Sequence, residues 1–193
     1  EYIRNFIMSK LEANTIDTIS GTTNLTIGST NASTVTFESG AATGHMSPAF
    51  EAYLGSSQTF SDQTTVKVNF NTEIFDSDSC YDASTNYRFT PTVAGKYFIY
   101  STVAFDGRSN SNLNVVQLNI YKNGSIYKEN QSYFIENYIR QISGCTNAII
   151  DMNGSSDYVE IYAYIDMISA SSDARLFGGS NKNSNFGAYR IGA

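Results

Sequence analysis

Three aspartates lie close together in a short stretch of the chain and are the first candidates for metal chemistry. Asp76, Asp78 and Asp82 lie between Phe75 and Tyr87. Carboxylate oxygens spaced in this way are hard ligands of the kind that calcium prefers. The stretch lacks the glycine and the bidentate glutamate of a recognised calcium loop, and such carboxylates also cap turns. The sequence therefore predicts turn-capping carboxylates, with calcium as the alternative and as the one cofactor candidate.

Catalysis finds little support in the residue types. A Ser-His-Asp or Cys-His arrangement would have to use the single histidine, His45, whose small and polar neighbours predict a solvated loop. Glycoside hydrolysis needs two acids at a defined separation across a sugar cleft, and the sequence shows neither. We therefore expect a protein that is not an enzyme, with a polysaccharide depolymerase as the least favoured function.

The chain has two cysteines, Cys80 and Cys145, and no CxxC spacing. Two cysteines are too few for a disulfide scaffold. They either pair across the fold or remain as two free thiols. The sequence leaves both alternatives open.

The charge of the chain limits its partners. Charged residues make up 16% of the 193 residues, and the formal net charge is −6. Nucleic-acid binding needs clustered Lys and Arg to neutralise phosphates, and binding to an anionic membrane surface needs a similar patch. We therefore expect neither nucleic acid nor membrane as a partner. The polar, weakly charged composition suits an extracellular or virion-exposed protein.

The first 14 residues differ in pattern from the rest. Ile3, Ile7 and Leu11 recur at four-residue spacing and predict one apolar stripe on a short helix. A helix this short is not stable alone in water, so we expect it to pack on a partner chain, a capsid or copies of itself. A frayed end is the alternative. Because the sequence begins at Glu1 rather than Met, we also expect a fragment or a processed product.

Residues 15–47 are rich in Thr, Ser, Asn and Gly and contain two short alternating segments. Leu25 and Ile27 point one way in the first segment, as do Val35 and Phe37 in the second. A single ribbon of this kind buries too little to stand alone. Three copies wound around an axis would bury these side chains together. The segment looks like the shaft of a trimeric bacteriophage fibre, with a disordered linker as the alternative.

Residues 48–193 predict a single all-β domain. Strand-like runs rich in Tyr, Phe, Val and Ile recur at a spacing of about 8–12 residues, which is typical of a β-sandwich or barrel. Asn123 and Gly124 supply the positive-φ pair of a type I′ turn and predict an antiparallel hairpin around them. The expected strands are 50–54, 66–75, 87–90, 95–106, 114–122, 125–132, 138–152, 157–165 and 185–191.

A series of residues in this domain matches the signature of a known family in the right order. The residues are Phe50-Glu-Ala-Tyr, Phe70, Asp76, Tyr81, Phe89, Gly95-Lys-Tyr-Phe-Ile, Tyr121-Lys-Asn-Gly, Gly154-Ser-Ser-Asp-Tyr-Val and Phe186-Gly-Ala-Tyr-Arg-Ile. On these residues the domain resembles the globular head of the complement C1q and tumour necrosis factor (TNF) superfamily. It departs from the pattern in the spacing from Tyr81 to Phe89, which is one residue longer, and at Ile99, where the family prefers Phe.

The resemblance implies a fold and an assembly. It implies a ten-stranded jelly-roll β-sandwich that forms a homotrimer, with aromatic-rich faces meeting at the three-fold axis. The core or trimer-interface residues would be Phe50, Tyr97, Ile99, Phe186 and Tyr189, with Phe186 and Tyr189 near the trimer seam. The stretch from Pro48 onward looks most like C1q-like domains of marine and cyanobacterial phage virion proteins. No Gly-X-Y collagen repeat precedes it.

The resemblance also implies a function. It points to a non-enzymatic trimeric viral fibre or spike on the virion surface, whose head recognises a host glycan or protein. The alternative is a capsid decoration or head-fibre protein, attached to capsid or tail proteins through its N-terminal segment. Tyrosines near loops rich in Asn and Ser suit adaptable recognition, and core or trimer packing is the other interpretation of them. The candidates are Tyr121, Tyr127, Tyr133 and Tyr138, with loops 106–114 and 178–185.

Overall fold

The computed structural model describes residues 46–108, 111–169 and 174–192. All of the described residues belong to one compact unit, Thr43–Ala193. Within the described ranges no helix is long and apolar enough to cross a membrane. Several predicted features lie outside the described residues: the helix over 1–14, the ribbon with Leu25, Ile27, Val35 and Phe37, and the loop residue His45.

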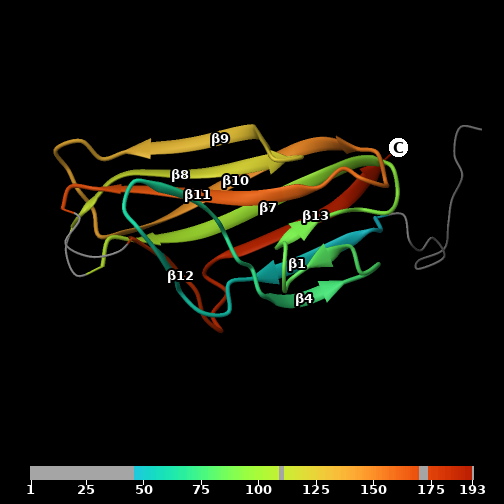
Figure 1. The fold of residues 1–193 in the computed structure, drawn as a ribbon, viewed down its shortest axis with the longest axis horizontal. Coiled ribbons are helices and arrows are strands. Elements are labelled where there is room, and N and C mark those ends of the chain that lie inside the picture. The colour runs from blue at the N-terminus through green and yellow to red at the C-terminus, as the bar shows by residue number, and fades with distance from the viewer. Residues whose placement is uncertain (1–45, 109–110, 170–173, 193) are drawn as a thin grey trace, which may run out of the picture. The chain divides into compact units, whose positions relative to one another are not determined.

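The described residues form thirteen strands in two sheets, which pack face to face as a sandwich (Figure 1). Sheet A consists of β1 (Ala49–Tyr53), β2 (Gln58–Phe60), β4 (Thr72–Asp76), β7 (Gly95–Asp106), β10 (Gln141–Met152), β12 (Ala174–Phe177) and β13 (Asn185–Gly192). Sheet B consists of β3 (Thr64–Lys67), β5 (Tyr81–Asp82), β6 (Arg88–Phe89), β8 (Leu113–Lys122), β9 (Ser125–Tyr133) and β11 (Val159–Met167). All pairings are antiparallel, which confirms the all-β sandwich expected from the sequence.

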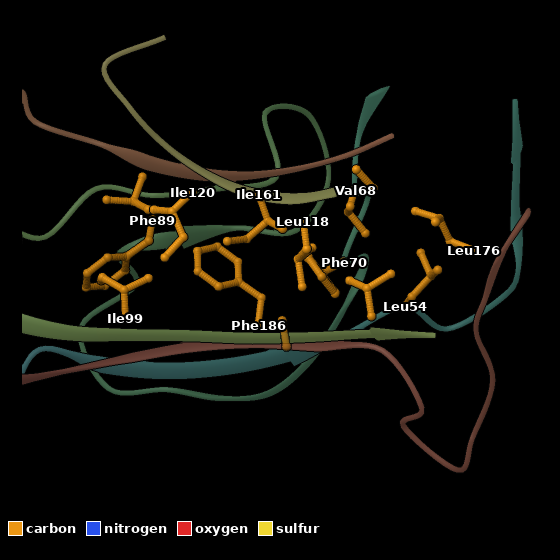
Figure 2. Packing of buried hydrophobic residues seen from close by; sticks show 14 of the residues in the cluster. Leu54, Val68, Phe70, Phe89, Ile99, Leu118, Ile120, Ile161, Leu176 and Phe186 are labelled. Atoms are coloured by element: carbon orange, nitrogen blue, oxygen red, sulfur yellow. The ribbon is translucent and has the colours of Figure 1, made fainter. Parts of the chain in front are cut away.

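The core follows from the two-residue alternation of the long strands. In β7, Tyr97, Ile99 and Val103 are fully buried, whereas Phe98 and Tyr100 face the other way. Figure 2 shows the buried side chains between the ribbons of the two sheets. Those labelled there are Leu54, Val68, Phe70, Phe89, Ile99, Leu118, Ile120, Ile161, Leu176 and Phe186. The two sheets therefore share one continuous apolar interior.

Aromatic rings fill the middle of this core. Phe50 stacks on Tyr81 with ring centroids 4.4 Å apart and meets Phe186 edge-on at 4.9 Å. Four of the five predicted core or interface residues, Phe50, Tyr97, Ile99 and Phe186, are completely buried within one chain. Phe186 is therefore part of the internal core and does not reach the surface at which a second copy would bind.

The predicted strand over 66–75 is wrong, because the chain changes sheets within it. β3 pairs with β11 in sheet B, whereas β4 pairs with β1 in sheet A. The residues between them cross the sandwich, and Val68 and Phe70 remain fully buried as they do so. An alternation of apolar and polar residues that continues through the crossing looks like one strand in sequence, although its backbone partners change.

The hairpin predicted at residues 123–124 is confirmed. Asn123 and Gly124 have φ values of 53° and 77°, as a type I′ turn requires. They connect β8 and β9, which pair antiparallel from Lys122 and Ser125 back to Val115 and Tyr133.

Candidate interaction surface

An apolar row crosses the outer face of sheet A, which is the face turned away from the core. Ile149 of β10 pairs with Phe98 of β7, Phe98 pairs with Tyr189 of β13, and Tyr189 pairs with Ala49 of β1. Ile149 is 56% exposed, and the ring centroids of Phe98 and Tyr189 lie 5.5 Å apart. We call these four residues the apolar row. Neighbouring apolar side chains at the surface mark interaction sites more often than scattered single ones do.

A second row lies beside it and packs Tyr100 over a glycine. Tyr100 pairs with Gly187, and Gly187 pairs with Glu51 of β1. The Tyr100 hydroxyl donates a hydrogen bond to Glu51 Oε2 at 3.2 Å. Burial and the Glu51 carboxylate raise the pKa of Tyr100 to about 12, so the hydroxyl keeps its proton at neutral pH. Phe75 of β4, 47% exposed, extends this row at the edge of the sheet.

Charge borders the apolar row on its other side. Lys96 pairs with Asp151 in the register of β7 and β10, and their charged groups lie 3.1 Å apart. Both side chains are largely exposed, so the ion pair adds little stability. The outer face of sheet A therefore carries apolar and aromatic groups in its middle and charge at one end. Of the residues in these rows, the sequence proposed Tyr189 alone as a core or trimer-interface residue.

The free edges of β9 and β10 are closed by side chains rather than by a strand ladder. Strand β10 pairs with β7 on one side, and its outward carbonyls on the other side accept hydrogen bonds from the β8–β9 hairpin. Lys122 Nζ donates to Asp151 O at 2.7 Å, and Lys128 Nζ donates to Asn147 O at 2.7 Å. The Tyr127 hydroxyl donates to the carbonyl of Ile149 at 3.2 Å. These contacts protect a sheet edge that would otherwise be open to pairing.

The four tyrosines proposed as a ligand surface have separate surroundings. Tyr121 packs against Tyr162 of β11 with the rings tilted by 33° and their centroids 4.1 Å apart. Tyr127 is bonded to β10 as described above. Tyr133 is 61% exposed at the end of β9, and Tyr138 is half-buried in the loop that follows. The structure therefore does not join these residues into one site.

Asp76 and Asp82 each cap a turn through backbone N–H groups, whereas Asp78 is bonded only to side chains. Asp76 accepts the backbone N–H of Tyr81 at 2.8 Å, and Asp82 accepts that of Thr85 at 2.9 Å. Asp78 accepts hydrogen bonds from serine hydroxyls, which lower the pKa of its carboxyl. The backbone N–H of Thr85 is the main cause that holds the pKa of Asp82 well below its usual range. In the described part of the chain, no group of three acidic, histidine or cysteine side chains converges as metal ligands.

The two cysteines are free thiols, so the disulfide alternative is wrong for this structure. Cys80 is buried, and Cys145 is exposed on the outer face of sheet A. Burial, with the Asp76 carboxylate as a further cause, raises the pKa of Cys80 far above the usual value for a thiol. Cys80 is therefore an inert core residue.

Solved structures share this fold at low sequence identity. The globular domain of zebrafish complement 1qA protein superposes with a TM-score of 0.52 at 19% identity, covering 75% of this chain and 97% of that domain. Murine APRIL at pH 8.0 gives a TM-score of 0.53 at 11% identity, with 74% of this chain and 98% of APRIL covered. APRIL at pH 5.0 gives 0.52 at 12% identity, with 74% and 99% covered. No protein-family model and no curated protein matches the sequence. The likeness shows a C1q/TNF-like jelly roll.

Proposed function

We propose that this chain is the head of a non-enzymatic homotrimer, a viral fibre or spike of bacteriophage type that recognises a host surface. The C1q/TNF-like fold supports the trimer, because domains of this fold typically form homotrimers. The phage assignment rests on the sequence: on the resemblance of residues 48–193 to phage C1q-like domains and on the ribbon predicted over 15–47. Virion-surface location belongs to the same proposal.

The apolar row on the outer face of sheet A is the main structural observation in support of the proposed trimer. A sheet with one face in the core normally turns polar residues to water on its other face. Here Ile149, Phe98 and Tyr189 take those positions side by side. Each good interface needs a desolvated apolar centre with a polar rim. The apolar row would supply the centre, and the Lys96–Asp151 ion pair would supply part of the rim.

A structural role on the capsid is the second candidate, favoured by the N-terminal segment. The four-residue spacing of Ile3, Ile7 and Leu11 predicts an apolar stripe that would suit attachment to capsid or tail proteins. In that function the head decorates or stabilises the particle and needs no host ligand. Both candidate functions include the trimer, so only a measurement of host binding distinguishes them.

Co-sedimentation of the full-length chain with bacterial cells tests the adhesive function. We expect the trimer to sediment with at least one strain of a panel that includes cyanobacteria. Phe98→Lys, which places charge in the apolar row, should weaken the trimer and with it the avidity that three linked heads provide. Tyr133→Lys, at an exposed position of sheet B, is the matched control and should leave cell binding unchanged.

Two results would count against the proposal. A trimer that binds no cells of any strain but binds purified capsids or tails would establish the decoration function in its place. A trimer that the double variant Phe98→Lys/Ile149→Lys leaves intact would exclude the outer face of sheet A as the contact. Circular dichroism would first confirm that each variant retains its β-sheet content.

A further inference from the structure

A depression of about 310 Å³ opens on the outer face of sheet A, near the end of β7. β7 changes neighbour at this point: Thr102 pairs with Asn185 of β13, whereas Ala104 pairs with Phe177 of β12. The chain between β12 and β13 is a loop, so the sheet has a gap here. The small side chain of Ala104 leaves the gap unfilled. The volume lies at the lower end of the range of about 300–1,000 Å³ that small-molecule sites occupy.

Buried hydrogen bonds hold the loop at this gap in place. Ser184 is fully buried, and its Oγ donates to Phe177 O at 2.7 Å while it accepts the N–H of Ala104 at 3.0 Å. At the other end of the loop, Gly179 N donates to Leu54 O at 2.9 Å. The loop that presents Asn183 is therefore tied to both flanking strands. A lining fixed in this way loses little conformational entropy when a ligand binds.

The lining combines the apolar residues Ala104, Phe105, Ile142 and Phe177 with neutral polar groups. Phe177 is 37% exposed, and the exposed side chains of Gln141, Ser143 and Asn183 surround the same space. Two carboxamides and a hydroxyl can both donate and accept hydrogen bonds. No charged side chain lines the depression among the described residues.

The charge beside the Phe177 ring is already neutralised. The Arg175 guanidinium lies 5.6 Å from the centroid of the Phe177 ring, and its Nε donates to Asp106 Oδ2 at 2.7 Å. Asp106 is completely buried and forms an ion pair with Arg175, so this guanidinium is not available to a ligand. An anionic or cationic ligand would find no free countercharge in the lining. A neutral ligand with one apolar face and several hydroxyls fits the groups present.

We propose that this depression binds a neutral pyranose unit of a surface glycan. The C–H face of the sugar stacks on Phe177, and its hydroxyls bond to Gln141, Ser143 and Asn183. The inference rests on the proposed host-recognition function and names the ligand class for it. The site lies on the same face as the apolar row but towards the far end of β7. Ala104 is six residues from Phe98, roughly 20 Å at the usual rise per residue, so a trimer contact over the apolar row does not have to cover the site. Lys96, at the start of β7, pairs with Gly192 at the end of β13. The site therefore lies at the opposite end of β7 from the C-terminus of the chain (Figure 1).

Saturation-transfer NMR on the full-length chain tests the site with simple probes. The probes are the methyl glycosides of glucose, galactose, mannose and N-acetylglucosamine at millimolar concentration. We expect at least one to bind, and Phe177→Ala to weaken that binding about tenfold or more through loss of the stacking surface. Gln141→Ala and Asn183→Ala, both at exposed positions, should each weaken it severalfold. Tyr133→Ala, which removes a more exposed aromatic ring elsewhere, is the control and should change nothing.

The outcomes separate this inference from the function on which it rests. If none of the four glycosides binds, or if binding survives all three substitutions in the depression, the inference is overturned. Equal binding of cells by the wild type and by the Phe177→Ala, Gln141→Ala and Asn183→Ala variants would support host recognition and refute the glycan site. If glycosides bind in a way that depends on Phe177 but no cells are bound, the result supports the glycan site and refutes host recognition. Should Phe177→Ala fail to fold, the two polar variants carry the test.

Discussion

Replacing Gly187 with alanine tests how the outer face of sheet A is packed. A Cβ atom at this position would lie 2.3 Å from Tyr100 Oη and 2.4 Å from Tyr100 Cζ. Gly187 is not among the positive-φ glycines, so its backbone accepts alanine and the cost is steric. The Tyr100 ring has to swing away, which breaks its hydrogen bond to Glu51. We expect a loss of about 1–3 kcal/mol in the free energy of unfolding, as in other overpacked sites.

Gly192→Ala on the same strand is the matched control. No atom lies within 4 Å of a Cβ built there, so we expect a change within about 0.5 kcal/mol. Urea unfolding followed by circular dichroism, at one fixed protomer concentration, measures both variants. Tyr100→Ala removes the obstructing ring, so in that background Gly187→Ala should lose most of its cost. Equal effects of the two glycine substitutions, or an undiminished cost in the Tyr100→Ala background, would refute the packing described.

Three further predictions concern the core, the thiols and pH. Phe186→Ala removes a fully buried ring and should lower the free energy of unfolding by about 3–5 kcal/mol, measured by urea unfolding; a loss under 1 kcal/mol would contradict its place in the core. A thiol reagent should label Cys145 alone in the native chain and Cys80 only after unfolding; rapid labelling of both would show that Cys80 is accessible. Because folding depresses the pKa of Asp82, its contribution to stability is present above its unfolded pKa of about 3.9 and is lost as pH falls through the folded value. The destabilisation by Asp82→Asn should therefore shrink in thermal melts below about pH 4; an effect that stays constant with pH would refute this.

Strand pattern and turn chemistry in the sequence were enough to predict the sandwich, since both are local. β7 occupies the predicted range 95–106, because its alternation of buried and outer residues is long and regular. Asn123-Gly124 strongly favours a type I′ turn, so the β8–β9 hairpin could be predicted. The short strands β2, β5 and β12 were missed, since two to four residues carry too little periodicity to be recognised.

The candidate surface was harder to predict, because it depends on register between distant strands. The apolar row joins residues from β1, β7, β10 and β13, and no local pattern brings them together. One signal was present in β7, where Phe98 and Tyr100 alternate with the core residues and make the strand apolar on both faces. Such a strand is usually covered on both sides. The depression beside Phe177 likewise needs the register of β12 against β7, which the sequence does not reveal.

The mass of the full-length chain in solution tests the central claim most directly. Light scattering coupled to size-exclusion chromatography should give three times the chain mass of 21.2 kDa, constant over a wide range of concentration. In the proposed trimer, partner copies would cover the apolar row and also the ribbon that the sequence predicts over 15–47. A stable monomer of 21.2 kDa would contradict the trimer, and with it the use of the outer face of sheet A as an interface between copies.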